Sequence, residues 1–192
     1  MNPQMIFLCF VLLTLSVKLY LGFKNTLFIK SHWSEVPKRF AADITLDEHQ
    51  KSIEYHGANF KFSLFNLFLD LVLLFAWTFG GGIDYLYNLV KVYELSFIKE
   101  SLLFIAGMSV VSYVIGLPMS LYHTFVIEEK FGFNKTTPKT FFIDQIKGLA
   151  LSLILGLPLM WVILFLLEKY QYNWWILTFR VLSRYQLLIM WL

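Results

Sequence analysis

The chain has little charge, a single cysteine and few histidines, and each scarcity excludes a class of protein. Of its 192 residues, 15% are charged and 58% are hydrophobic, whereas roughly a quarter of an ordinary soluble chain is charged. The lone cysteine, Cys9, rules out a disulfide framework or a cysteine zinc site within the chain. The Lys and Arg residues, which give a net charge of +3, lie scattered between apolar runs. That distribution excludes nucleic acid as a partner.

The usual catalytic motifs are also missing. The four histidines are His32, His49, His56 and His123. None is followed by Glu and no two lie four residues apart, so the helical ligand pair of a zincin does not exist here. Gly80-Gly81-Gly82 lacks the Lys and Ser/Thr of a phosphate-binding loop, and no Gly-x-Ser-x-Gly elbow occurs. The sequence therefore predicts no catalytic residue, no metal ligand and no cofactor in this chain.

What the chain does contain is a series of long apolar runs. About 20 apolar residues in a helix cross the ~30 Å hydrocarbon core of a bilayer. The pattern predicts an all-α, polytopic transmembrane bundle of about five helices in contact with lipid. The expected spans cover approximately residues 5–23, 62–79, 102–122, 148–167 and 174–192. The first run has no basic start and is too long for a cleaved signal peptide, so we interpret it as a retained anchor.

The connections between these runs carry their own signals. A short surface helix is expected around Thr45–Tyr55, with Asp43 or Thr45 as its cap. The three glycines from Gly80 predict the end of the second span, and a polar segment at 123–147 separates the third span from the fourth. The tight connection at 168–173 predicts that the fourth and fifth helices are antiparallel neighbours.

The distribution of Lys and Arg predicts the orientation in the membrane. The first and third connections hold ten such residues and the second and fourth hold three. Because cytoplasmic connections are enriched in Lys and Arg, we expect the first and third connections to be cytoplasmic and the N-terminus to lie outside. The membrane would be the bacterial inner membrane or the endoplasmic reticulum.

Polar and kinking residues inside the spans offer further hypotheses. Asp70 is the one acid deep in an expected span, where an ionisable group faces a cavity or a partner. Its candidate partners are Lys18, Arg180 and Arg184, either as a structural ion pair or as the lining of a water-filled interior. The sequence Ile115-Gly-Leu-Pro118 is echoed at Leu155-Gly-Leu-Pro158. We interpret this echo as two proline kinks in preference to the inverted repeat of a transporter.

The third connection is the most distinctive segment. Its adjacent carboxylates, its lysines and its two phenylalanines flank a turn expected at Gly132. The residue types alone allow either a solvated charged loop or a surface that docks on a membrane or another domain. The residues of this candidate docking loop are Glu128, Glu129, Phe131, Gly132, Phe133, Asn134, Lys135, Asp144 and Lys147.

A resemblance adds to this reading. The stretch Glu128-Glu-Lys-Phe-Gly-Phe-Asn-Lys-Thr136, followed by Phe141-Phe-Ile-Asp-Gln-Ile-Lys147, resembles the N-terminal membrane domain of the type I CAAX prenyl endopeptidases. Residues 48–62 and the pair Trp174-Trp175 fit the same family. The resemblance implies a polytopic zinc metalloprotease with seven transmembrane helices around a chamber. Its substrates would be prenylated CAAX peptides or other membrane-associated peptides, and its His-Glu-x-x-His catalytic domain would follow the fifth helix.

This sequence departs from the family pattern because it carries no such motif. We therefore expect the chain to form part of the chamber wall, to be inactive alone, and to dock through the third connection on a catalytic domain absent from this sequence, for which a separate polypeptide is one candidate source. Zinc belongs to the complete family protein in this interpretation. The alternatives are a standalone transporter-like module, a non-catalytic scaffold, or the remnant of a truncated gene.

Overall fold

The computed structural model describes residues 2–191, and every regular element in that range is a helix. The predicted all-α class is thus confirmed. The helices form two compact units, which are described separately. Unit 1 holds the chain up to Val72 together with Met119–Lys135, and unit 2 holds Leu73–Pro118 together with the chain from Thr136 onward.

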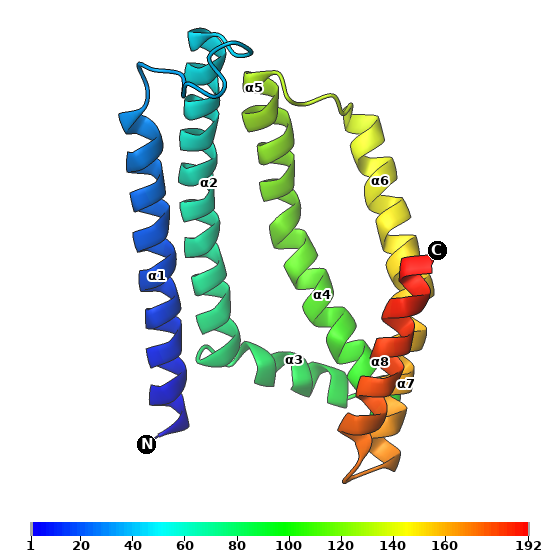
Figure 1. Ribbon diagram of the computed structural model, residues 1–192. Coiled ribbons are helices and arrows are strands. Elements are labelled where there is room, and N and C mark those ends of the chain that lie inside the picture. Colours follow the sequence, from blue (N-terminus) through cyan, green and yellow to red (C-terminus); the bar gives the residue numbers. More distant parts are fainter. Residues whose placement is uncertain (1, 192) are drawn as a thin grey trace. The chain divides into compact units, whose positions relative to one another are not determined.

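Unit 1 is built on two long helices, α1 (Pro3–Ser31) and the larger part of α2 (Leu46–Thr78), which run side by side in opposite directions (Figure 1). Helix α1 starts where the Asn2 side chain accepts a hydrogen bond from the Gln4 N–H at 3.1 Å, with Pro3 in the first turn, where its missing N–H costs nothing. The remaining elements of unit 1 are the π-helix η1 (His123–Glu128) and the single turn α5 (Glu129–Phe131).

Helix α2 differs from the sequence prediction, because the expected surface helix at 45–55 and the expected span at 62–79 form one continuous element. The physical reason is that only Gly57 interrupts the join, and one glycine costs a helix about 1 kcal/mol, too little to break it. The predicted cap is confirmed, since Thr45 Oγ1 accepts from the Glu48 N–H at 3.3 Å and Glu48 Oε2 accepts from the Thr45 N–H at 2.9 Å. The predicted stop is confirmed too, since α2 ends at Thr78 and Gly81 adopts a φ of 75°.

Unit 2 contains the remaining helices. They are α3 (Gly82–Lys91), α4 (Phe97–Tyr122, in this unit as far as Pro118), α6 (Pro138–Leu151), the π-helix η2 (Ser152–Gly156), α7 (Leu157–Lys169) and α8 (Trp174–Trp191). Helices α7 and α8 pack together as the short connection predicted (Figure 1). Helix α3 was not expected. Its amphipathic ten residues, with Asp84 in the first turn and Lys91 in the last, bury only Val90.

The third connection is shorter than the sequence suggested. Helix α4 continues through η1 and α5 to Phe131, and α6 already begins at Pro138 after the Thr137 side chain caps it through the Thr140 N–H. The polar residues at 123–131 are therefore mostly helical. One of them, His123, bonds to Asn59 of α2, as described below.

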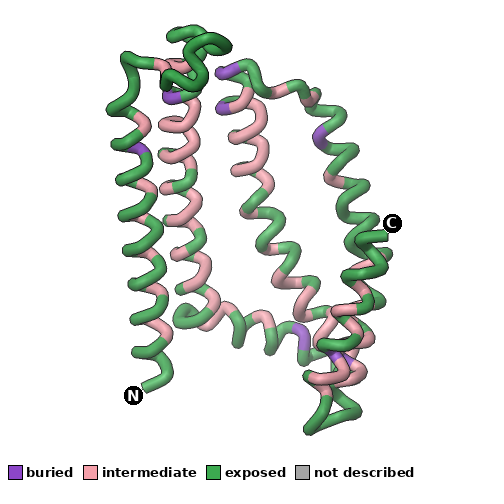
Figure 2. The backbone as a smooth tube through the Cα atoms, viewed as in Figure 1, coloured by how far each residue is buried: buried purple, intermediate pink, exposed green. Residues whose placement is uncertain are grey.

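In the part of the chain that the structure describes, four helical stretches are long and apolar enough to cross a membrane by length and composition: Pro3–Ser31, Leu46–Thr78, Phe97–Phe131 and Pro138–Lys169. They contain the first four expected spans. The fifth expected span is the helix α8, whose residues include Arg180 and Arg184, and it is not among the four. Most residues along the long helices are exposed or only partly buried (Figure 2), which suits side chains in contact with lipid.

Candidate functional site

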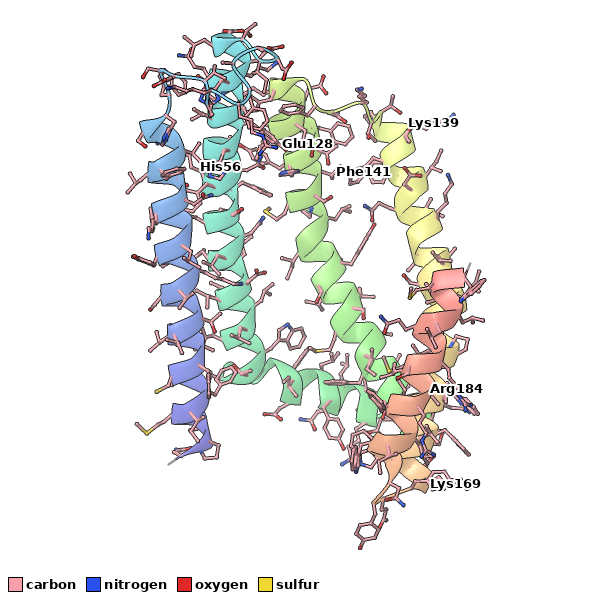
Figure 3. The ribbon with its side chains drawn as sticks, in the orientation of Figure 1. His56, Glu128, Lys139, Phe141, Lys169 and Arg184 are labelled. Atoms are coloured by element: carbon pink, nitrogen blue, oxygen red, sulfur yellow. The ribbon has the colours of Figure 1, made fainter. Side chains whose placement is uncertain are left out.

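The best-buried side chains of unit 1 gather at one end, near the first and third connections (Figure 2). Thr26 of α1, Ile53 of α2, Ile127 of η1 and Phe131 of α5 are each at most 8% exposed. We call this region, formed by the C-terminal part of α1, the N-terminal half of α2, η1 and α5, the polar end of unit 1. Figure 3 labels His56 and Glu128, two of its titratable residues.

A histidine links α2 to η1 at the polar end. His123 Nε2 lies 2.8 Å from Asn59 Oδ1, so that ring nitrogen carries the hydrogen and donates it. On its other side, His123 Nδ1 lies 3.5 Å from Glu128 Oε1. Its ring also packs on Phe62, with centroids 5.2 Å apart. Since the His123 and Glu128 side chains are 31% and 30% exposed, the cluster is half-buried and reachable by water.

The π-helix brings this pair together. His123 and Glu128 are the first and last residues of η1, five positions apart. In an α-helix, residues five apart point about 140° away from each other around the axis. In a π-helix the hydrogen bonds join residues i and i+5, so such residues come nearly into line. The His123–Glu128 contact is therefore a product of the π geometry, and a sequence reading based on α-helical spacing does not find it.

The turn predicted at Gly132 is confirmed, and its geometry fixes the aromatic residues around it. Gly132 has a φ of 75°. The Phe133 N–H donates to the Glu128 carbonyl at 2.9 Å and the Gly132 N–H donates to the Glu129 carbonyl at 3.0 Å. These two bonds form a Schellman motif, which closes a helix through a left-handed residue. The turn places both Phe131 and Phe133 against Tyr55 of α2, at centroid distances of 5.4 and 4.7 Å.

The other residues of the candidate docking loop fall into two groups. In unit 1, Asn134 Nδ2 donates to Glu129 Oε2 at 2.9 Å, and Lys135 is exposed. In unit 2, Asp144 and Lys147 of α6 form an exposed ion pair at 3.4 Å. Phe131 is only 4% exposed and so packs within unit 1, whereas Phe133 is 53% exposed. The loop's exposed apolar surface in unit 1 is thus Phe133.

A second contact ties α1 to α2 at the same end. Thr26 Oγ1 lies 3.4 Å from His56 Nε2, and Phe23 packs edge-on against Phe60 with centroids 5.2 Å apart. A Cβ added to Gly22 would lie 2.5 Å from the Phe60 ring. The Phe60 ring can therefore lie close to the α1 backbone at Gly22 because that residue has no side chain.

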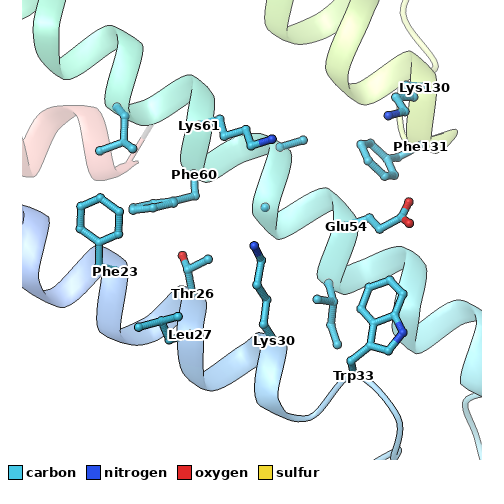
Figure 4. A pocket seen from close by; sticks show the side chains of 14 residues that line it. Phe23, Thr26, Leu27, Lys30, Trp33, Glu54, Phe60, Lys61, Lys130 and Phe131 are labelled. Atoms are coloured by element: carbon cyan, nitrogen blue, oxygen red, sulfur yellow. The ribbon is translucent and has the colours of Figure 1, made fainter.

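Cavities lie on either side of this close approach. One of about 950 Å³ opens between α1, α2 and α5 toward the polar end (Figure 4). Another of about 350 Å³ lies further along the two helices and is lined by Lys18 and Asp70 as well as by Ser63 and Asn66. Phe60 borders both.

The expected intramembrane polar residues are partly brought together. Lys18 and Asp70 share the smaller cavity but form no ion pair within 4 Å. Arg180 and Arg184 lie on α8 in unit 2, are exposed, and have no ion-pair partner within residues 2–191 (Figure 3). Whether these residues line a water-filled interior stays a prediction.

The donor sets do not fit zinc. Within residues 2–191, no group of three or more His, Cys, Asp or Glu side chains lies close enough to hold a metal ion. The nearest approach to such a set is the single pair His123 and Glu128, with the amide of Asn59 beside it. This arrangement supplies a hydrogen bond between α2 and η1.

Sequence reasoning missed several residues of the polar end. Asn59, Tyr55 and His56 fall inside what was expected to be a surface helix or its continuation, and His123 was considered only as a zinc ligand. One signal was present: on a single uninterrupted α2, Tyr55, His56, Asn59 and Phe62 recur at spacings of three and four and share adjoining faces.

Comparisons with known proteins place these features in context. A family profile described as the N-terminal part of CAAX prenyl protease, with five membrane helices, matches residues 25–192. CAAX prenyl protease 1 of Saccharomyces cerevisiae is 31% identical over 176 residues, which cover 85% of this chain and 38% of that protein. The Homo sapiens homologue is 37% identical over 108 residues, covering 51% of this chain and 21% of the human protein.

A solved structure is similar to nearly the whole chain. The crystal structure of S. mikatae Ste24p matches with a TM-score of 0.88 and 26% identity, covering 99% of this chain and 45% of that one. The chain thus spans about two fifths of the length of the relatives it matches. The profile's five helices equal the number of spans expected from the sequence.

Proposed function

This chain belongs to the CAAX prenyl protease family, as its N-terminal membrane part, and from that premise we propose that it forms a wall of the membrane chamber in which a zinc endopeptidase cleaves prenylated or other membrane-associated peptides. The chain is a multi-pass membrane protein. In this proposal its first and third connections face the cytoplasm, on the side where the catalytic part of the enzyme lies.

One observation carries the proposal. Most of the segment that resembles the family, Glu128–Thr136, lies in the polar end and makes several contacts there. The His123–Glu128 pair, the Schellman turn at Gly132 and the Tyr55 contacts all fix its backbone. A loop fixed from within, with Phe133 and Lys135 still exposed, is suited to serve as a rigid platform for another domain.

The chain's own contribution in this proposal is structural. Since the described residues offer no metal-binding set, the zinc and the activated water would come from the rest of a complete enzyme, either from the same polypeptide or from a separate one. What residues 2–191 supply is positioning: a lipid-facing shell and a fixed surface at the polar end.

A chimeric enzyme tests the proposal. Residues 25–192 would replace the matching segment of S. cerevisiae CAAX prenyl protease 1, and cleavage of a farnesylated CAAX peptide would be measured in membranes. We expect activity within about tenfold of the parent, because the segment would rebuild the chamber wall. The chimera with Phe133→Glu should lose most of that activity, while the chimera with Lys169→Gln, at the exposed end of α7 and outside the docking loop, should keep it.

Two results would refute the proposal. One is a chimera that inserts and folds, as judged by monodisperse elution, yet cleaves no peptide. The other is zinc-dependent cleavage by the isolated 192-residue chain, which would show that the metal site lies within it.

A further inference from the structure

We infer that the cavity between α1, α2 and α5 is a binding site for an anionic phospholipid, whose headgroup lies among three lysines and whose acyl chain follows the apolar groove between α1 and α2. The site belongs to unit 1 alone and does not depend on the proposed peptidase role. Its volume of about 950 Å³ is large enough for a headgroup and part of a chain.

The charges at the cavity favour an anion. Lys30 of α1, Lys61 of α2 and Lys130 of α5 line it, against a single carboxylate, Glu54. Figure 4 shows the side chain of Lys30 reaching from α1 toward α2, with Lys61 on α2 and Lys130 on α5. Within residues 2–191, no carboxylate lies within 4 Å of any of these three ammonium groups. Three lysines from three elements, with one acid among them, leave a net positive site that an anion would complete.

The apolar lining favours a lipid over a free anion. Away from the polar end the walls are Phe23 and Leu27 on α1, and Phe60 and Leu64 on α2. Trp33 lies at the other end of the lining, where α1 has just ended, and Trp is typical of the membrane interface. Gly57 and Ala58 keep the α2 wall thin, and a Cβ added to Gly57 meets nothing within 4 Å. A ligand that is anionic at one end and apolar at the other matches this order of residues.

The test uses the purified full chain in detergent and native mass spectrometry with dioleoyl phosphatidylserine and dioleoyl phosphatidylcholine. We expect the serine lipid to bind about tenfold more tightly than the choline lipid. The triple variant Lys30→Gln, Lys61→Gln, Lys130→Gln should reduce that preference to about twofold. The reason is that each lysine near an anionic headgroup raises the affinity by at most about fivefold. The matched control Lys24→Gln, Lys38→Gln, Lys135→Gln removes the same charge from exposed sites outside the cavity and should keep the preference.

A second variant tests the contribution of the apolar groove without changing the charge of the site. Gly57→Leu places a side chain into the cavity without altering the charge, and leucine is the better helix former, so α2 should keep its fold. We expect it to weaken binding of the serine lipid at least fivefold.

Four outcomes would overturn the inference. An unchanged preference in the cavity triple variant would exclude the lysines, and an equal loss in the control triple would show a general surface-charge effect. Competition by soluble glycerophosphoserine as strong as by the lipid would indicate a site for free anions. Displacement of the lipid by a farnesylated peptide at equal concentration would indicate a prenyl-chain site instead.

Discussion

Residues 2–191 contain two π-helices, η1 and η2, and their surroundings differ sharply. Helix η1 begins and ends with the titratable pair His123 and Glu128, and it leads into a turn that packs two phenylalanines on Tyr55. Helix η2 reads Ser-Leu-Ile-Leu-Gly, contains no buried residue, and directly precedes Leu157-Pro158. The same backbone widening thus occurs once beside a polar cluster and once in an apolar helix.

The difference indicates two separate causes. In an α-helix, the ring of Pro158 would clash with the carbonyl of Ile154, four residues earlier. Since Ile154 lies within η2, the wider turn moves that carbonyl away and accommodates the proline. Pro118, in contrast, lies five residues before His123, and η1 follows it at a distance. We attribute η1 to the contacts it permits, between His123, Asn59 and Glu128. The predictions below follow from this assignment.

The largest expected effect is at the aromatic contact that follows η1. Phe131→Ala removes a ring that is 4% exposed and packs on Tyr55, and should lower the free energy of unfolding by about 3 kcal/mol. The matched change after η2, Leu157→Ala, truncates a side chain that is 47% exposed and should cost less than about 1 kcal/mol. Unfolding in mixed detergent micelles, followed by tryptophan fluorescence, measures both. Equal losses would mean that the two π-helices have equivalent surroundings.

The next largest effect is a difference in stability between alanine substitutions at two glycines, one after η1 and one in η2. Gly132 has a φ of 75°, so Gly132→Ala forces an alanine into the left-handed region at about 1–2 kcal/mol. Gly156, the last residue of η2, has a φ of −75° and open space where a Cβ would stand. Gly156→Ala should therefore be neutral or stabilise the fold by up to about 1 kcal/mol. The same unfolding measurement decides, and a stabilising Gly132→Ala would show that the Schellman turn does not hold.

Much of the fold was predictable from sequence because hydrophobic length and glycine stops are local signals. The stop after Thr78, the Thr45 cap, the turn at Gly132 and the antiparallel α7 and α8 each depend on a few adjacent residues. The sequence does not predict the continuity of α2, since the polar residues at 45–61 are typical of a connection between two spans. Several of them make contacts far apart in the sequence: Asn59 bonds to His123 of η1, Tyr55 packs on Phe131 of α5, and His49 bonds to the His32 carbonyl after α1.

The polar end was only half predictable for the same reason. The motif at Glu128–Thr136 drew attention to the right loop, but its partners Asn59 and Tyr55 come from about seventy residues earlier in the chain, and no local pattern joins them. The π-helix also breaks the α-helical spacing on which pair predictions rest, so the five-residue separation of His123 and Glu128 carried no signal.

A double-mutant cycle sharpens the assignment of η1 itself. Asn59→Leu and His123→Phe each remove one partner of the 2.8 Å hydrogen bond, and phenylalanine keeps a ring on Phe62. Each single variant should lose about 1–2 kcal/mol, and the double variant should recover about 1 kcal/mol relative to their sum. Ser152→Ala in η2 serves as the control and should change stability by less than about 0.5 kcal/mol. Strict additivity would show that the hydrogen bond does not couple α2 to η1.

The smallest effect is expected at the start of α2, where Glu48 accepts hydrogen bonds from Thr45 and both residues are exposed. The hydrogen bonds from the Thr45 backbone N–H and hydroxyl hold the pKa of Glu48 below its usual 4.5. Because the folded pKa of Glu48 is depressed, its stabilisation of the helix start is complete above the unfolded pKa and is lost as the pH falls through the folded pKa.

Hydrogen exchange of the first-turn amides of α2, relative to the unfolded chain, should therefore show less protection as the pH falls from about 6 to about 3. Glu48→Gln keeps the capping geometry without the charge, so its protection should not vary with pH. A wild-type profile as flat as that of Glu48→Gln would show that the carboxylate charge does not contribute. The first turn of α2 would then be stabilised by packing and neutral hydrogen bonds alone.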